Sequence, residues 1–292
     1  MSISNGIVEC LLRLSGASKE VSEKTFYREM RENAVKERRA ATRVPHCLGV
    51  RVEHAVYCGM NYFLFIPREM DTYNAIMYIH GSGYTNVYRR AQLRFAADLA
   101  KNLHAKVYFP LYPKLPVATA RAAYALLRNF YAFLCKKGDV YLIGDSSGGA
   151  LALSLASEHT SVRSVVAISP WVRLDVGEEG RKAEGDLLLS LSKLDYTAKL
   201  WRDDLDCDDV RVSPIFGHYE GRDILLIAGE KEIFRPDIVD FFRKHSANGA
   251  KVTYIEGRDG QHCYPLMPTR EGRSARRAIY EKIGEYLYGE RV

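Results

Sequence analysis

The chain has 292 residues, a formal net charge of +6, and an ordinary balance of 47% hydrophobic to 27% charged residues. This composition is typical of a folded globular protein and excludes a disordered or low-complexity chain. Basic and acidic side chains are interleaved along residues 19–42, so the positive charge does not form the stripe expected of a nucleic-acid-binding protein. We therefore expect no nucleic-acid partner.

The remaining bulk features concern metals, membranes and location. Six cysteines are scattered without a C-x-x-C pair or a Cys/His cluster at ligand spacing, so we expect no metal. Apolar runs are too short to span a bilayer, and residues 1–19 lack the pattern of a signal peptide. We expect no membrane span and a cytoplasmic location. The oligomeric state stays open, with a homo-oligomer as one option.

The first part of the chain predicts two helices and a hairpin. Apolar residues recur at helical spacing in residues 5–15 and 19–42. Two strand-like stretches, 50–58 and 60–66, flank Gly59 and predict an antiparallel hairpin.

From residue 74 onward, strand-like and helix-like segments alternate. The predicted strands are 74–79, 105–109, 140–143, 164–168, 224–228 and 252–255, and the predicted helices are 91–102, 117–135, 147–157, 236–246 and 274–287. The stretch 171–217 is less regular and contains one predicted helix near 190–202. Continuous apolar strands that alternate with helices predict a mostly parallel sheet with helices on both faces.

A serine between two glycines follows the predicted strand 140–143. The residues there are Gly144-Asp145-Ser146-Ser147-Gly148. On so sharp a strand-to-helix turn, the serine hydroxyl projects from the sheet edge, and glycines two residues away leave room for the turn. Ser146 is the predicted nucleophile, because Ser147 has Asp145 where its upstream glycine would be. The alternative is a glycine-rich turn with a capping serine.

A second small-residue loop follows the strand ending at Ile79. It reads His80-Gly81-Ser82-Gly83-Tyr84. Small residues let consecutive backbone N–H groups turn toward one point, so the N–H groups of Ser82, Gly83 and Ser147 are a predicted oxyanion hole. His80 is then a positioning residue. The alternative is a tight turn around a buried histidine.

Two later strand ends supply a base and an acid. His262 lies in a glycine-bearing loop before the last predicted helix, where an imidazole can reach the serine. Glu232 follows the strand 224–228 and is the predicted partner of His262, with Glu230 as the alternative.

These motifs resemble the hormone-sensitive-lipase-like family of α/β-hydrolase esterases. The matches are H-G-G-G-[FYW] at residues 80–84 and G-D-S-[AS]-G-G at residues 144–149. The chain order Ser146, Glu232, His262 is also that of α/β-hydrolases. The resemblance extends over residues 48–290 through looser similarities.

The resemblance implies an α/β-hydrolase fold and serine carboxylesterase activity on small to medium acyl esters, without a cofactor. It also implies an N-terminal helical cap, made of residues 1–45 and part of 171–217, over a catalytic domain of residues 46–292. Two rival functions stay open: an amidase or peptidase with the same triad, and a non-catalytic ligand-binding protein on a hydrolase scaffold. The presence of His262 favours chemistry.

The chain departs from the family pattern at three places. Ser82 replaces a glycine of the predicted oxyanion loop, residues 80–84, and Lys114-Leu115-Pro116 replaces the usual segment after Tyr112-Pro113. The acid loop has a G-x-x-E pattern where the family more often has G-x-D. Several aromatic residues near the motifs suggest an apolar substrate pocket: Tyr84, Tyr88, Phe109 and Tyr264. The alternative is that they are core residues, which look the same in the sequence.

Overall fold

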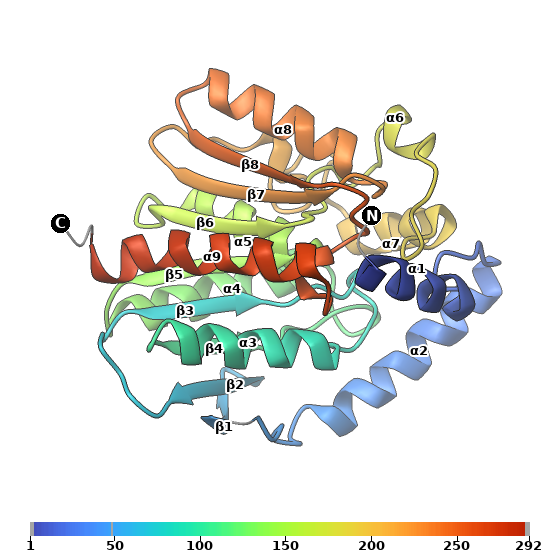
Figure 1. Ribbon diagram of the computed structural model, residues 1–292. Helices are drawn as coiled ribbons and strands as arrows, with labels where there is room; N and C mark the ends of the chain where they lie inside the picture. Colours follow the sequence, from blue (N-terminus) through green and yellow to red (C-terminus); the bar gives the residue numbers. More distant parts are fainter. Residues whose placement is uncertain (1–2, 48, 290–292) are drawn as a thin grey trace.

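The computed structural model describes residues 3–47 and 49–289. Within these residues, eight strands form one sheet in the order β1-β2-β4-β3-β5-β6-β7-β8 (Figure 1). The predicted hairpin is present as β1 (Val50–Tyr57) and β2 (Met60–Pro67), which pair antiparallel. β2 also pairs antiparallel with β4 (Lys106–Pro110).

All the other strand pairs of this sheet are parallel. The strands concerned, besides β4, are β3 (Ala75–Ile79), β5 (Val140–Asp145), β6 (Ser164–Ile168), β7 (Asp223–Gly229) and β8 (Lys251–Gly257). Every residue of β3, β6 and β7 is buried, because helices cover both sides of these strands. The mostly parallel sheet predicted from the sequence is confirmed.

Helices cover the two faces of the sheet (Figure 1). One face carries α3 (Arg90–Asn102) and α9 (Arg270–Tyr288), and the other carries α4 (Ala120–Cys135), α5 (Ser146–Glu158) and α8 (Arg235–Ala247). Alternate residues of β3 belong to the two resulting cores. Ile76 and Tyr78 pack with residues of α3 and α9, whereas Met77 and Ile79 pack with α4, α5 and α8.

The other α-helices of the described residues lie beyond the carboxyl ends of the parallel strands (Figure 1). They are α1 (Ile3–Ser15), α2 (Glu23–Ala40), α6 (Glu178–Arg181) and α7 (Leu191–Arg202). α2 begins later than its apolar pattern predicted, because Ser22 caps it by accepting a hydrogen bond from the Thr25 N–H. Phe26 of α2 packs on Tyr196 of α7, with ring centroids 5.3 Å apart.

The helix predicted near 190–202 is confirmed as α7, but it is not the only helix that the structure describes within 171–217. Besides α7, the structure has α6 and a short 3₁₀ helix, Pro214–Phe216, in this stretch. Both have four residues or fewer, which is too short for an apolar period to show in the sequence. In the described ranges, every helix is too short or too polar to cross a lipid bilayer.

Candidate active site

Ser146 stands at the junction of β5 and α5, on a strained turn. Its φ is +52°, in the left-handed region that side chains other than glycine rarely adopt. A Cβ at Gly148 would lie 2.0 Å from the Ile79 carbonyl oxygen, and one at Gly144 would lie 2.3 Å from the Gly148 carbonyl oxygen. Both contacts are with backbone, so the turn can form only with glycine at these positions.

A continuous hydrogen-bonded chain joins Ser146, His262 and Glu232. Ser146 Oγ lies 2.9 Å from His262 Nε2. On the other side of the ring, His262 Nδ1 lies 2.6 Å from Glu232 Oε2. The remaining oxygen of Glu232 accepts the backbone N–H of Gly229 at 2.8 Å, which fixes the carboxylate. The structure thus brings together the three residues selected from the strand ends.

The alternative acid, Glu230, points elsewhere. Its carboxylate is exposed and accepts the backbone N–H of Asp259 at 2.7 Å. The geometry therefore places the carboxylate of Glu232, and not that of Glu230, against His262.

Burial and charge act in opposite directions on the pKa of His262. Burial disfavours the charged imidazole, whereas Cys263 and the Glu232 carboxylate favour it, and the pKa is raised well above its usual value. We attribute the rise to Glu232, because burial raises the pKa of the Cys263 thiol and keeps it neutral. Burial also raises the pKa of Glu232, and its bond to His262 opposes that rise.

Asp145, just before Ser146, connects the strand-to-helix turn of residues 144–148 to the loop of residues 80–84. It is buried, and its Oδ1 accepts hydrogen bonds from Tyr78 Oη at 2.7 Å and the Gly81 N–H at 3.0 Å. Its Oδ2 accepts one from Gln92 Nε2 at 2.8 Å. In the sequence, Asp145 stood out only as part of the serine motif. Its hydrogen-bonding role was not predicted, because its partners come from other segments of the chain.

The three predicted oxyanion donors lie close to the serine. Ser82 and Gly83 line the same cavity as Ser146. Ser147 is in the first turn of α5, where backbone N–H groups have no acceptor within the helix. The Ser82 N–H donates to Ser147 Oγ at 3.0 Å, so this donor has a hydroxyl partner in the structure.

His80 is a buried, neutral part of the loop. Its ring stacks on Phe109 with centroids 5.0 Å apart, and its Nδ1 lies 3.2 Å from the Gly81 carbonyl oxygen. Burial, together with the nearby Lys114 ammonium, holds the pKa of His80 well below its usual value. These contacts suit the positioning role predicted for it.

A cavity of about 340 Å³ opens beside Ser146 and His262. Its apolar wall includes side chains of α1, of α7 and of the loops after β6 and β7: Val8, Leu12, Leu194, Trp171 and Phe234. Among the described residues, no group of three or more His, Cys, Asp or Glu side chains is placed to hold a metal ion.

Of the two interpretations of the aromatic residues near the motifs, pocket lining or core, the structure does not support the pocket lining. None of the four described residues Tyr84, Tyr88, Phe109 and Tyr264 borders the cavity. Three of them are buried in the cores, and Tyr84 stacks on Trp201 with ring centroids 4.0 Å apart. Sequence position near a motif did not distinguish core aromatics from those of the pocket.

The chain is similar to two acetyl-hydrolases. One, from Streptomyces hygroscopicus, is 28% identical over 228 residues, which are 72% of this chain and 74% of the relative. The other, a candidate acetyl-hydrolase named LipR from Mycobacterium tuberculosis (strain ATCC 25618 / H37Rv), is 27% identical over 231 residues, 75% of this chain and 73% of the relative.

A solved structure and a family model agree with the fold. The crystal structure of an esterase from the bacterial hormone-sensitive lipase family is similar with a TM-score of 0.82, at 18% identity and 98% coverage of both chains. The model of the alpha/beta hydrolase fold family matches residues 76–266, well over half of the chain. The chain therefore belongs to the α/β-hydrolase fold family, as its two glycine motifs predicted.

Proposed function

We propose that this protein is a serine carboxylesterase that hydrolyses small to medium acyl esters through an acyl-enzyme intermediate. One observation carries the proposal: the hydroxyl of Ser146, the imidazole of His262 and the carboxylate of Glu232 form one hydrogen-bonded chain at the wall of an apolar cavity. The two acetyl-hydrolase relatives support an ester of a small acyl group as substrate.

In the acylation step, Ser146 Oγ attacks the carbonyl carbon of the ester while His262 Nε2 takes the hydroxyl proton. The Nδ1–H of His262 donates to Glu232, which holds this tautomer and stabilises the imidazolium as it forms. His262 then gives its proton to the alcohol oxygen, and the alcohol leaves. The acyl group stays on Ser146 as an ester.

The negative charge on the carbonyl oxygen needs donors that are already in place. We assign this role to the backbone N–H groups of Ser82, Gly83 and Ser147, each worth about 3–4 kcal/mol in the transition state. For Ser82, the oxyanion replaces the hydroxyl of Ser147 as the acceptor. A charged acceptor forms the stronger hydrogen bond, so this exchange favours the transition state.

In the deacylation step, a water molecule takes the place of the alcohol. His262 removes a proton from the water as it attacks the acyl carbon, and the same N–H groups hold the second oxyanion. The Ser146–acyl bond then breaks, the proton returns to Ser146 Oγ, and the carboxylic acid leaves.

The cap assignment belongs to this proposal. Residues 1–45 and part of 171–217 are assigned to a cap that covers the catalytic domain, residues 46–292, and shapes the acyl pocket. Residues 1, 2, 48 and 290–292 of these ranges lie outside the described part of the chain. The support is that Val8 and Leu12 of α1 and Leu194 of α7 form part of the cavity wall. A volume of about 340 Å³ suits small to medium acyl groups.

Ser146→Ala tests the proposal with p-nitrophenyl acetate as substrate. We expect kcat to fall by about 10⁵- to 10⁶-fold, because the remaining groups supply no nucleophile. Circular dichroism and thermal unfolding should match those of the wild type. Retained turnover in a folded variant would contradict the assignment.

Two further measurements separate the rival functions. Matched ester and amide substrates compare the reaction classes, and the proposal expects a higher kcat/KM for the ester. A fluorophosphonate probe should label the wild type at Ser146 and leave Ser146→Ala unlabelled. A wild type that the probe does not label would indicate a binding protein on a hydrolase scaffold.

A further inference from the structure

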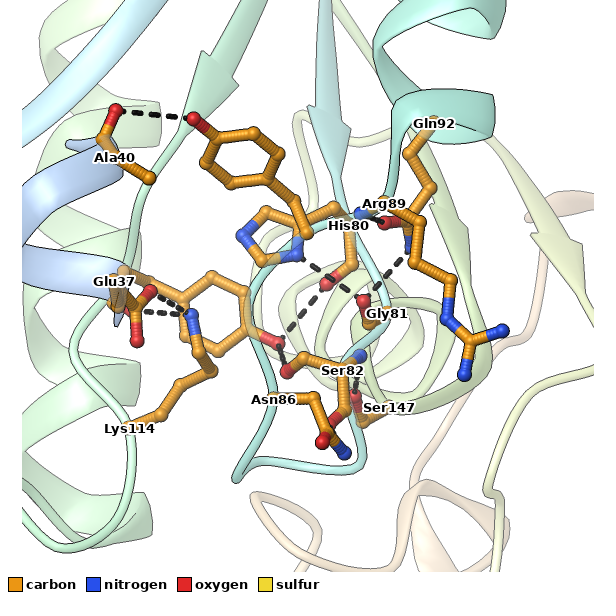
Figure 2. Close-up of polar contacts among 12 residues, drawn as sticks. Glu37, Ala40, His80, Gly81, Ser82, Asn86, Arg89, Gln92, Lys114 and Ser147 are labelled. Carbon is orange, nitrogen blue, oxygen red and sulfur yellow. Dashed lines mark hydrogen bonds and ion pairs between the residues drawn. The ribbon is translucent and has the colours of Figure 1, made fainter. Parts of the chain in front are cut away.

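Lys114 is a buried cation that the proposed mechanism does not use. It follows β4, its side chain is 1% exposed, and its ammonium forms an ion pair with Glu37 of α2 (Figure 2). An unpaired charge in such a place would be strongly destabilising. The sequence showed Lys114 only as a departure from the family pattern.

Lys114 also contacts Tyr112, which forms hydrogen bonds with the oxyanion loop, residues 80–84. The ammonium lies 4.9 Å from the centroid of the Tyr112 ring and 3.5 Å from the Tyr112 carbonyl oxygen. Tyr112 Oη donates to the His80 carbonyl oxygen at 3.0 Å. It lies 3.3 Å from Ser82 Oγ, which is left as the donor of that bond.

Helix α2 reaches the same loop at a second point. Asn33 Nδ2 donates to Asn86 Oδ1 at 2.8 Å, and Asn86 Nδ2 donates to the Ser82 carbonyl oxygen at 2.9 Å. Ser82 is therefore held on its side chain through Tyr112 and on its backbone through Asn86. Both routes lead back to α2.

A third contact ties the end of α2 to the histidine of the loop. The Ala40 carbonyl oxygen accepts a hydrogen bond from Tyr88 Oη at 3.0 Å, and the Tyr88 ring meets the His80 ring edge-on at 5.9 Å. Figure 2 shows Glu37 and Ala40 on one side of this network and Ser82 with Ser147 on the other.

We propose that Glu37 and Lys114 are positioning residues for the oxyanion hole, an inference that rests on the proposed esterase function. Their ion pair fixes Tyr112, and Tyr112 holds Ser82 so that its N–H faces the carbonyl oxygen of the substrate. A helix of the N-terminal segment thereby completes a site whose donors all belong to the catalytic domain.

Glu37→Gln and Lys114→Met test the proposal. With p-nitrophenyl acetate, we expect kcat to fall about tenfold in each, while KM stays within about twofold, because the oxyanion exists only in the transition state. This is less than the 100- to 1,000-fold that complete loss of a donor costs. The double variant should lose no more than either single one, because both break the same contact.

A second readout separates positioning from a merely structural role. A trifluoromethyl ketone forms a hemiketal with the serine and places an oxyanion in the hole. Its inhibition constant should rise in Glu37→Gln by the same factor as kcat falls. Glu29→Gln is the matched control, since Glu29 lies on the same helix and pairs with Lys193 of α7 at 2.8 Å. We expect its kcat and inhibition constant to equal those of the wild type.

A kcat of Glu37→Gln equal to that of Glu29→Gln would overturn the inference, as would a loss that appears only in KM or in thermal stability. If Lys114→Met does not fold, Glu37→Gln decides alone, because Glu37 is partly exposed. Failure of the proposed function has a different signature: a wild type without ester turnover, or turnover retained in Ser146→Ala.

Discussion

In the proposed mechanism, the carboxylate of Glu232 determines the pH at which His262 can act as a base. Only the neutral imidazole can take the serine proton, so activity is lost as pH falls through the pKa of His262. Because that pKa is raised well above 6.5, we expect the acid limb of the kcat/KM profile to lie above pH 6.5. A limb below pH 6 in the wild type would contradict the assignment of His262 as a base paired with a carboxylate.

Glu232→Gln tests the same pair by removing the charge. The neutral amide no longer stabilises the imidazolium, so the acid limb should move to lower pH. The amide also favours the wrong tautomer, so kcat should fall by about 10³- to 10⁴-fold. Glu230→Gln is the control, and we expect its profile to overlay that of the wild type, because Glu230 does not contact the imidazole. Equal effects of the two substitutions would contradict the choice of Glu232.

At the scale of single residues, the sequence was enough to select the candidate residues whose side chains are themselves reactive. Ser146, Glu232 and His262 follow from residue type and from their place after a strand. The partners of Asp145 and the pair Glu37–Lys114 did not follow. These contacts join residues that are 53 to 77 positions apart in the chain, and no periodic pattern records which polar groups meet there.

The elbow between β5 and α5 depends on glycine as an element. In Gly148→Ala, the new Cβ would lie 2.0 Å from a backbone oxygen of β3, which cannot move without shifting the strand. We expect the free energy of unfolding to fall by about 3 kcal/mol or more, measured by urea denaturation. Gly284→Ala is the control: its Cβ would meet only Leu103 at 3.9 Å, inside α9.

The control substitution should stabilise the protein by about 0.5–1 kcal/mol, since alanine favours the interior of a helix. Equal stability of Gly148→Ala and the wild type would show that the turn tolerates a side chain.

The long helices and strands of the fold were predictable from the sequence, because their apolar period repeats over several helical turns or strand residues. α6, with four residues, carried no such signal.

At the scale of the whole molecule, the sequence predicted the layers and an apolar pocket, but not which residues line that pocket. The alternation of strands and helices was enough for a sheet covered on both faces. The apolar wall of the cavity, however, includes residues from α1, α7 and two loops, and these meet only because of how the N-terminal helices pack. Tyr84 and Phe109, which lie next to motifs in the sequence, became core residues instead.

We therefore expect the N-terminal segment to determine which acyl-chain lengths the enzyme prefers. Val8 and Leu12 of α1 face the cavity, so Val8→Ala/Leu12→Ala removes apolar contacts with the distal part of a longer acyl chain. Since each buried CH₂ contributes about 0.8 kcal/mol, we expect kcat/KM for a hexanoate ester to fall about four- to tenfold, with that for an acetate ester unchanged. Leu11→Ala, on the same helix but 62% exposed, should leave both values unchanged. Equal losses for acetate and hexanoate would show instead that α1 acts on the catalytic groups and not on the acyl chain.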